Sequence, residues 1–283
     1  MEWSVPSIPS PVIVPRSSRL RTPSKRSQTA TVATASPAVD APPCVRELQA
    51  QLLQREQALL AMERFVYICS HDLREPLRMV SGFLGLLERR SQGLNEQQLD
   101  YLGLALGGAK RLDAMLEALL VYSRCGRSRA PRECSSSDVL NEALAKVRME
   151  HPQVEIHCTV ARLPVVWADP VQLSELFYQL LANAVIFRQG GDAQIAISAE
   201  ATPQTVTILV ADRGIGIAPG DRQRVLEVFQ RLHPVGAYPG TGMGLALCAR
   251  IMEQHHGTIS VVEPPAGVST LVACSFPHHD PPA

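Results

Sequence analysis

The sequence predicts an α+β protein in which a dimerising helical hairpin is followed by an α/β sandwich domain. A seven-residue apolar repeat runs from residue 45 to residue 87, and a second helical apolar run occupies residues 99–120. From residue 138 onward, short strand-like runs alternate with helical patterns, which indicates strands and helices in mixed order. The chain has 283 residues, enough for one or two ordinary domains with a buried core.

Charge and cysteine usage narrow the class of protein. The 27 basic residues balance 27 acidic ones, so no overall field favours nucleic acid or an anionic membrane. Seven scattered cysteines without a CxxC pair argue against a disulfide framework and a zinc site. No apolar run approaches the roughly 18 to 20 residues that span a bilayer. We therefore expect a cytoplasmic protein with no membrane span and no nucleic-acid partner.

The first 44 residues differ in composition from the rest of the chain. They are rich in Pro, Ser, Thr and Ala, so they cannot bury enough surface to offset their backbone entropy. We interpret residues 1–44 as a disordered leader. Because this segment is also rich in arginine and poor in acidic residues, it resembles an organellar transit peptide, and organellar targeting stays open.

Residues 45–125 are expected to form the helical hairpin. Residue types that favour turns, Ser91, Gly93 and Asn95, separate its two apolar runs, and the first helix would be about 60 Å long. Two helices alone leave apolar flanks exposed, and a second copy would cover them by forming a four-helix bundle. We therefore predict a homodimer. The first repeat consists of Val45, Leu52, Leu59, Val66, Leu73, Val80 and Leu87.

The second domain is predicted over residues 138–277, after a linker at 126–137 and before a short tail at 278–283. Asp169 followed by Pro170 is a typical helix start, with a capping side chain and a proline at the first helical position. We expect one sheet covered by helices on one face. The expected helices are 138–148, 170–185 and one from the glycines at 240–244 to about 256; the expected strands are 154–160, 164–167, 195–199, 206–210, 258–262 and 269–276.

The first helix carries the string SHDLREPLR over residues 70–78, which places a histidine next to a carboxylate. With Val66 at heptad position a, His71 falls at position f, the position farthest from the seam, so we expect it to be exposed. Asp72 could fix its tautomer, leaving the other ring nitrogen to attack an electrophile. Pro76 should bend the helix beside this pair. A lone exposed histidine is more often an ordinary solvated residue, and the neighbouring Asp72 and Pro76 are what favour chemistry.

Two glycine-rich strings mark a second candidate site. ADRGIGI, residues 211–217, follows an expected strand, and GTGMGLAL, residues 240–247, precedes an expected helix. Backbone N–H groups at such a helix start suit phosphate oxygens. Neither string is a dinucleotide fingerprint or a P-loop, and either alone is commonly a structural turn. Together they are expected to frame one pocket.

These strings, taken in order with LLANAVIFR at residues 180–188, resemble the kinase core of sensor histidine kinases of two-component systems. The subgroup joined to phytochrome-type sensors is the most similar. SHDLREPLR resembles the phosphoacceptor box, LLANAVIFR the Asn box, and the other two strings the glycine boxes. VFQRLHPVGAYPGTG, residues 228–242, resembles the Phe box and a short ATP lid. The resemblance covers residues 45–277.

The resemblance implies an ATP-binding domain of the histidine kinase and chaperone type, a requirement for ATP and Mg²⁺, and a role for each matching residue. His71 would be phosphorylated and would pass the group to an aspartate of a separate response-regulator receiver, with an upstream sensor acting in trans. Asp72 would be its base or orienting partner. The nucleotide-binding residues would be Asn183 as the Mg²⁺ ligand, Asp212 for the adenine amino group, Gly214 and Gly216 around it, and Gly240, Thr241, Gly242 and Gly244 around the triphosphate.

Four positions depart from the family pattern. Gln179 stands where the family usually has Asn, and Arg213 stands where it commonly has Asn. Ile186 stands where the family often has a Lys that contacts phosphate. Arg188 or Arg213 could supply the missing positive charge. Glu75, which we group with the catalytic residues, stands where members that dephosphorylate their partner often carry Thr or Asn, so we predict weak phosphatase activity.

Two alternatives to a kinase remain open. A histidine phosphotransfer or scaffold protein with a degenerate nucleotide domain would explain Gln179 and Ile186. An ATPase of the heat-shock-chaperone or mismatch-repair type would leave the helical hairpin without a role. The adjacent pairs at 255–256 and 278–279 are expected to be solvated surface histidines, since residues i and i+1 do not face one site.

Overall fold

The structure is a computed structural model that describes residues 43–90, 93–125, 130–234 and 237–278. The leader expected over residues 1–44 lies outside the described residues, except for its last two positions, which begin the first helix. Of the expected tail, only residue 278 is described. The described residues fall into two units, 43–62 and the part from 63 onward.

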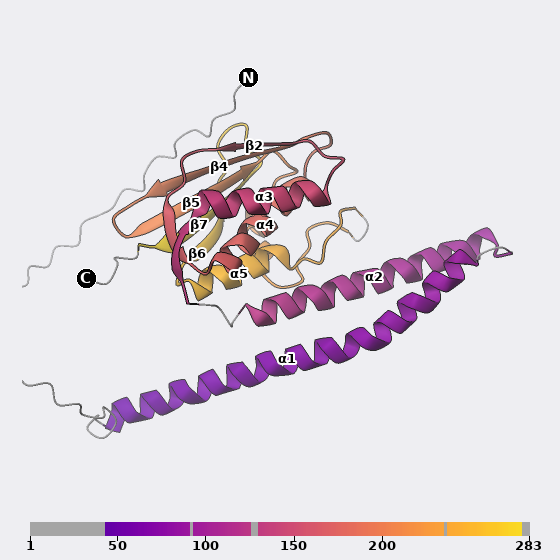
Figure 1. The fold of residues 1–283 in the computed structure, drawn as a ribbon, viewed down its shortest axis with the longest axis horizontal. Helices are drawn as coiled ribbons and strands as arrows, with labels where there is room; N and C mark the ends of the chain where they lie inside the picture. Colours follow the sequence, from indigo (N-terminus) through magenta and orange to yellow (C-terminus); the bar gives the residue numbers. More distant parts are fainter. Residues whose placement is uncertain (1–42, 91–92, 126–129, 235–236, 279–283) are drawn as a thin grey trace, which may run out of the picture. The chain divides into compact units, whose positions relative to one another are not determined.

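Two long helices confirm the helical hairpin (Figure 1). Helix α1 spans Pro43–Arg89 and helix α2 spans Glu96–Arg124. Asn95 caps α2 by accepting a hydrogen bond from the backbone N–H of Gln98, whose side chain in turn accepts one from the backbone N–H of Asn95, each at 2.9 Å. Helix α1 continues through Pro76, so this proline does not end it.

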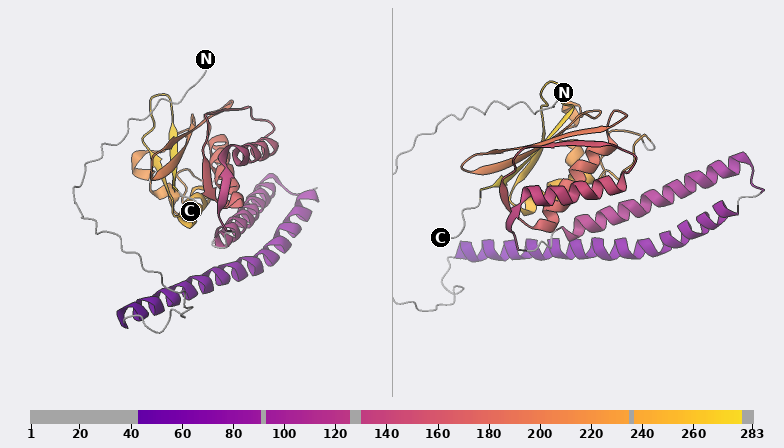
Figure 2. Two further views of the ribbon diagram at one scale, coloured as in Figure 1. Left: turned by 60° about the vertical axis from the view of Figure 1, so that its left-hand side comes forward. Right: turned by 45° about the horizontal axis from the view of Figure 1, so that its top comes forward.

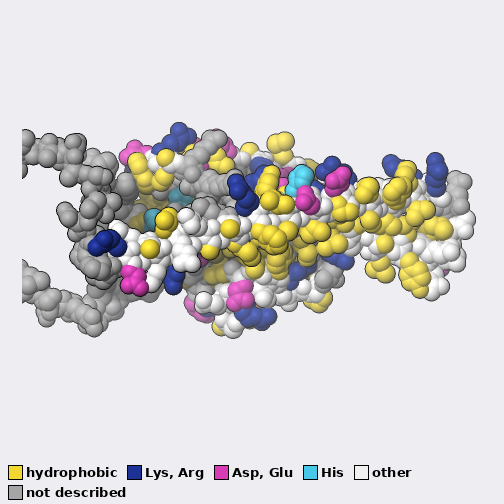
Figure 3. All heavy atoms as spheres, turned by 90° about the horizontal axis from the view of Figure 1, so that it is seen from below, with side chains coloured by type: hydrophobic (Ala, Val, Ile, Leu, Met, Phe, Trp, Pro, Cys, Tyr) yellow, Lys and Arg dark blue, Asp and Glu magenta, His cyan; other side chains and the backbone are white. Residues whose placement is uncertain are grey.

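The part of the hairpin from residue 63 onward has ion pairs between its two helices and leaves much apolar surface exposed. Arg74 of α1 forms ion pairs with Asp113 and Glu117 of α2. Figure 3 shows hydrophobic side chains gathered along these helices. The exposed apolar residues include Phe65, Ile68, Leu73, Met79, Val80, Phe83, Leu87, Leu99, Leu104 and Leu112.

The second domain is built on a five-stranded sheet with the order β2-β4-β5-β7-β6. Strands β2 and β4 are parallel, and the other neighbouring pairs are antiparallel. The strands are β2 Ile156–Val160, β4 Ala193–Ala201, β5 Thr205–Asp212, β6 Thr258–Val262 and β7 Thr270–Pro277. The helices are α3 Ser136–Glu150, α4 Pro170–Ile186 and α5 Gly244–Gln254, with single 3₁₀ turns at Pro219–Asp221 and Arg224–Leu226.

Helix α4 lies at the centre of the core, where it packs against α3, α5 and strand β4 (Figure 2). Leu173, Leu176 and Phe177 are almost fully buried, and Ile195 and Ile197 of β4 are equally buried in the same apolar cluster. The helix begins as predicted, because Asp169 accepts a hydrogen bond from the backbone N–H of residue 171 at 2.9 Å. The α+β architecture is therefore confirmed, and α4 is a rigid base for side chains near its C-terminal end.

The expected linker at 126–137 is wrong over its second half. Arg132–Ser135 forms strand β1, which pairs antiparallel with β3, Val165–Ala168, in a separate two-stranded sheet. Cys134 and Val166 face each other in this register and are both buried. The strand forms because it covers an edge of the core, so the domain fold includes residues before 138 and has two sheets instead of one.

The prediction that His255 is a solvated residue is also wrong. The residue is 8% exposed, and its Nε2 accepts a hydrogen bond from the backbone N–H of Asp169 at 2.9 Å. Its Nδ1 donates to the carbonyl of Ile251 at 2.7 Å. The ring therefore ties the end of α5 to the start of α4. His256 is exposed, as expected. Among the helices that the structure describes, none is long and apolar enough to cross a membrane.

Candidate functional site

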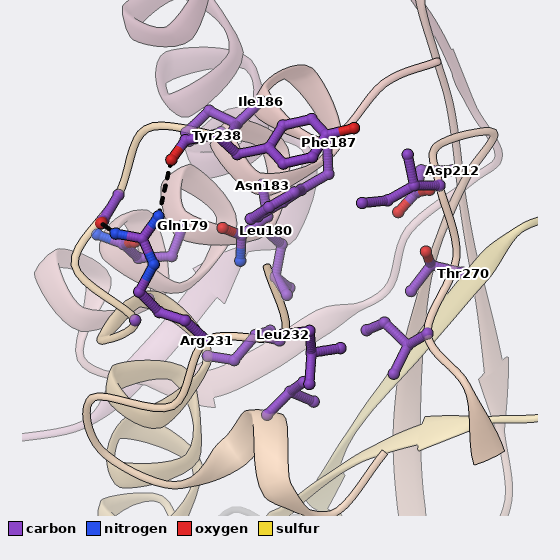
Figure 4. Close-up of a pocket in the computed structure, with 18 of the residues that line it drawn as sticks. Gln179, Leu180, Asn183, Ile186, Phe187, Asp212, Arg231, Leu232, Tyr238 and Thr270 are labelled. Atoms are coloured by element: carbon purple, nitrogen blue, oxygen red, sulfur yellow. Dashed lines mark hydrogen bonds between the residues drawn. The ribbon is translucent and has the colours of Figure 1, made fainter. Parts of the chain in front are cut away.

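A pocket of about 260 Å³ opens between α4, the ends of β5 and β7, and the segment that leads into α5 (Figure 4). It brings together residues from the Asn box and from both glycine strings, which are up to about 60 positions apart in the sequence. Of the predicted nucleotide-binding residues, those that line the pocket are Asn183, Asp212, Gly216, Gly240, Thr241, Gly242 and Gly244.

One end of the pocket is formed by Asp212, the last residue of β5. Its Oδ1 accepts a hydrogen bond from the backbone N–H of Gly214 at 2.8 Å, and Thr270 lies opposite it in the β5–β7 register. Burial raises the pKa of the Asp212 carboxyl, while the hydrogen bonds from Gly214 and Thr270 act to lower it. The result is a partly dehydrated acceptor facing the pocket, which suits an amino group such as that of adenine.

Gly214 and Gly216 allow this end to close around Asp212. A Cβ on Gly214 would lie 2.5 Å from the carbonyl oxygen of Phe187, which already accepts a hydrogen bond from Ile215 at 2.9 Å. Gly216 has φ +78°, a conformation that disfavours residues with side chains. Both positions therefore require glycine, and Gly214 shapes the pocket from behind although it does not line it.

The other end is formed by the glycine turn before α5. Gly240 and Gly242 have φ +128° and +76°. A Cβ on Gly242 would lie 2.6 Å from the carbonyl oxygen of Gln230, and one on Gly244 would lie 2.8 Å from Oε1 of Gln179. The turn thus packs tightly on its neighbours and leads into a helix N-terminus, where free N–H groups and the helix dipole suit anions.

Three polar side chains lie at this second end: Asn183, Gln179 and Arg231 (Figure 4). The Asn183 amide lies next to Gly244, with both of its terminal atoms 3.5 Å from the position of a Cβ there. An amide oxygen is the kind of neutral ligand that Mg²⁺ accepts, and this amide lies next to the glycine turn. The pocket therefore fits a nucleotide with its base at Asp212 and its phosphates, with Mg²⁺, at the glycine turn.

Arg231 is a pocket residue that sequence reasoning missed. Its guanidinium donates to the carbonyl oxygens of Gly240 at 2.6 Å and Tyr238 at 2.8 Å, which use only two of its five N–H groups. Arg188 and Arg213, the cations expected near the phosphates, instead bond to carbonyls outside the pocket lining. Neither of these two side chains lines the pocket, whereas Arg231 does.

Three aromatic rings cover the side of the pocket next to Arg231. Phe187 lies 5.2 Å from the ring of Tyr238 and 6.2 Å from that of His233, and the last two are 5.1 Å apart. Phe187 joins both glycine segments, because its carbonyl holds Ile215 and its ring packs on Tyr238. The Asn box thus fixes the positions of both glycine turns.

The predicted histidine site lies on α1. The side chains of His71 and Asp72 are each 71% exposed, whereas the preceding Ser70 is buried. Nδ1 of His71 lies 3.2 Å from Oδ1 of Asp72. If Nδ1 carries the proton, Asp72 accepts it in a hydrogen bond and Nε2 keeps its lone pair for an incoming electrophile. Glu75 is exposed on the next turn.

Comparison with known families agrees with this arrangement. Residues 61–126 match the His Kinase A phospho-acceptor domain, which includes His71, Asp72 and Glu75. Residues 168–280 match the family described as histidine kinase-, DNA gyrase B- and HSP90-like ATPase, which includes the whole nucleotide pocket. The chain belongs to the sensor histidine kinases, with a phosphoacceptor hairpin followed by an ATPase domain of this fold.

Curated relatives point to the same family. The phytochrome-like protein Cph1 of Synechocystis sp. is 37% identical over 78% of this chain and 30% of its own length. Cyanobacterial phytochrome A of Nostoc sp. is 36% identical over 73% of this chain and 27% of its own. The methanogenesis regulatory histidine kinase FilI of Methanothrix harundinacea is 31% identical over 82% of this chain and 26% of its own length. The chain thus spans less than a third of the length of these relatives.

Among solved structures, the full-length ShkA in complex with AMPPNP is similar to this chain. The TM-score is 0.52 with 25% sequence identity, and the match covers 76% of this chain and 45% of ShkA.

Proposed function

We propose that this protein is an ATP-dependent histidine kinase that phosphorylates His71 and transfers the phosphoryl group to an aspartate of a separate response-regulator receiver. The observation that carries the proposal is the pocket, with a part-buried acceptor at Asp212 and a glycine turn with Arg231 at its opposite end. The exposed His71–Asp72 pair supplies a nucleophile that a large partner can reach.

The chemistry follows from the geometry of the pair. Nε2 of His71 would attack the γ-phosphorus of ATP, forming a P–N bond while the P–O bond to ADP breaks. Asp72, next to Nδ1, would stabilise the positive charge that develops on the ring. The same exposed Nε2 would then deliver the phosphoryl group to a receiver carboxylate. Such transfers depend mainly on alignment and neutralisation of charge.

Mg²⁺ would be held by the amide oxygen of Asn183. When bound there it would offset negative charge on the triphosphate, to which the Arg231 guanidinium also contributes. The backbone N–H groups of residues 240–244 would bind phosphate oxygens, and Thr241 is part of the same lining.

The hairpin is proposed to form a homodimer. The apolar residues exposed on α1 and α2 would pack against a second copy as a four-helix bundle. A dimeric mass in light scattering at micromolar concentration is the expected result, and a monomeric mass would count against it. An upstream sensor protein would act on this dimer in trans.

Glu75 is proposed to make the protein a weak phosphatase. The Glu75 carboxylate, one turn from His71, is poorly suited to orient water toward a phosphorylated receiver, because the carboxylate and the phosphoryl group are both negatively charged. Adding the purified protein to a phosphorylated receiver should therefore leave the phosphate in place, and its rapid loss would contradict this assignment.

A second candidate function is a phosphotransfer or scaffold protein whose nucleotide domain has lost its ligand. It is favoured by Gln179 and Ile186, which replace a usual amide and a usual cation in the pocket lining. It predicts that a fluorescent ATP analogue does not bind, whereas the kinase proposal predicts saturable binding that Asn183→Ala weakens in the presence of Mg²⁺.

The deciding experiment is incubation with γ-labelled ATP and Mg²⁺. Wild type should become labelled with an acid-labile phosphoryl group, whereas His71→Gln and Asn183→Ala should not. His157→Gln is a matched control, because His157 is also an exposed histidine within 4 Å of carboxylates, those of Glu155 and Asp192. Label in the His71→Gln protein would contradict the proposal. ATP hydrolysis without His71 would favour an ATPase of the chaperone type.

A further inference from the structure

Helix α4 carries a second amide one turn before Asn183. Gln179 lines the pocket, and its Nε2 donates a hydrogen bond to Oε1 of Glu175 at 2.7 Å in a part-buried setting. A carboxylate can only accept hydrogen bonds, so the NH₂ group of the amide must face Glu175. The contact therefore determines which end of the Gln179 amide points away from Glu175.

The end that points away is the carbonyl oxygen, and it lies next to the glycine turn. Oε1 of Gln179 is 2.8 Å from the position that a Cβ on Gly244 would occupy, and Oδ1 of Asn183 is 3.5 Å from the same point. Two amide oxygens therefore approach the first residue of α5 from one face of α4. The absence of a side chain at Gly244 lets the Gln179 amide approach the turn this closely.

We propose that Gln179 is a second amide oxygen donor to the Mg²⁺ bound with the nucleotide, and that Glu175 is the residue that positions it. This inference rests on the proposed function. Mg²⁺ prefers hard oxygen ligands in a fixed arrangement, so an amide with a locked orientation is a better ligand than a freely rotating one. A carboxylate behind a ligand typically changes metal affinity 10- to 100-fold.

The alternative is that Glu175 and Gln179 form an ordinary surface pair along the helix. Side-chain pairs spaced by four residues contribute only about 0.2–0.5 kcal/mol to a helix. Such a pair would affect the stability of α4 slightly and would not alter how strongly Mg²⁺ improves ATP binding. The dependence of ATP binding on Mg²⁺ therefore separates a positioning role from a structural one.

The test measures the dissociation constant of ATP for the full chain, with EDTA and with excess Mg²⁺, by calorimetry. The ratio of the two constants is the Mg²⁺ enhancement. Gln179→Ala and Glu175→Ala should each reduce this enhancement about 10- to 100-fold. Glu175→Gln keeps an acceptor but loses the charge, so it should give an intermediate reduction.

Two further variants complete the design. Glu150→Gln is the matched control, because Glu150 also accepts a hydrogen bond from a pocket-lining residue, the hydroxyl of Tyr178 at 2.6 Å, but not from an amide that faces the turn. It should keep the wild-type enhancement. In a Gln179→Ala background, Glu175→Ala should cause no further loss, since its effect acts through Gln179.

The possible outcomes separate the two proposals. Two outcomes overturn the inference and leave the kinase proposal intact. In the first, the alanine variants lose ATP affinity equally with and without Mg²⁺. In the second, both alanine variants keep the wild-type Mg²⁺ enhancement while Asn183→Ala abolishes it. If wild type does not bind ATP, both fail. Circular dichroism checks that each variant is folded. If Glu175→Ala does not fold, the Mg²⁺ enhancement of Glu175→Gln tests the role of Glu175.

Discussion

Replacing Gly242 with alanine should impair nucleotide binding, whereas the same replacement at Gly190 should not. Both glycines adopt left-handed backbone conformations, with φ +76° at Gly242 and +67° at Gly190. Forcing alanine into this region costs about 1–2 kcal/mol at either position. The two positions differ in their surroundings, because a Cβ at Gly190 would have no atom within 4 Å.

At Gly242 the added methyl group meets the rest of the site. Its Cβ would lie 2.6 Å from the backbone oxygen of Gln230 and 3.1 Å from Cγ of Arg231. Because the nearest atom belongs to the backbone, the turn has to move, and overpacking of this kind costs about 1–3 kcal/mol more. The expected totals are about 2–5 kcal/mol for Gly242→Ala and about 1–2 kcal/mol for Gly190→Ala.

Thermal unfolding with and without ATP and Mg²⁺ measures both effects. Ligand at 100 times its dissociation constant stabilises a protein by about 2.7 kcal/mol, so wild type and Gly190→Ala should show the same upward shift in Tm on adding ATP. Gly242→Ala should unfold at a lower temperature and lose most of this shift. Equal destabilisation of the two variants, or a full ATP shift in Gly242→Ala, would refute the steric argument.

Three other changes test different parts of the structure. Burial raises the pKa of the Asp212 carboxyl, so the folded protein binds a proton at this group more tightly than the unfolded chain does. The free energy of unfolding should therefore fall as pH rises from the ordinary carboxyl range through the raised pKa. Asp212→Asn should remove this decline in urea unfolding across that range and abolish adenine-nucleotide binding; an unchanged pH profile would contradict it. His255→Phe leaves the buried N–H of Asp169 without an acceptor and should cost about 1–3 kcal/mol in urea unfolding, and a loss within error would count against the ring as a tie between helices. Leu73→Arg places a charge on an exposed apolar position of α1 and should convert the proposed dimer to a monomer in light scattering, whereas an unchanged mass would exclude this position from the interface.

Local patterns were sufficient to predict the helices. The heptad repeat, the turn residues and the Asp169–Pro170 start are each contained within a few neighbouring residues, and α1, α2 and α4 begin and end close to the expected positions. Strand β1 has no such pattern, since Arg132 and Glu133 precede its only buried apolar residue. It is a strand because β3 offers it a pairing edge, and this depends on contacts across about 30 residues.

His255 was predictable from a pattern already present in the sequence. Cys248, Ile251 and Met252 form the buried stripe of α5, and His255 continues it at the next helical spacing. Helical spacing, and not adjacency to His256, therefore determines whether His255 is buried. Thr270, by contrast, is opposite Asp212 only through the register of β5 and β7, which no local pattern specifies.

The direction of a long charged side chain was the least predictable part of the site. Arg188 and Arg213 lie within the family motifs, yet their guanidinium groups satisfy carbonyls of nearby loops. Arg231 lies in the segment before the glycine turn and holds two carbonyls of that same turn. The position of a flexible arginine depends on which nearby carbonyls lack hydrogen-bond donors, and this depends on how the loops fold.

This arrangement leads to a prediction about the missing lysine. Ile186 and Arg231 both line the pocket, and Arg231 lies at the end where the phosphates are expected (Figure 4). A hydrogen bond to a charged group contributes about 1.5–3 kcal/mol, so Arg231→Met should weaken ATP binding by about 10- to 100-fold while leaving adenosine binding unchanged. Arg188→Met is the matched control and should change neither.

Adding Ile186→Lys to Arg231→Met should restore part of the ATP affinity, because it returns a positive charge to the same lining. Calorimetric titration with ATP and with adenosine distinguishes this effect from a general loss of the pocket. If Arg231→Met weakens both ligands equally, its contribution lies in holding the carbonyls of Tyr238 and Gly240 and not in its charge. The phosphates would then depend on the backbone N–H groups of the glycine turn alone.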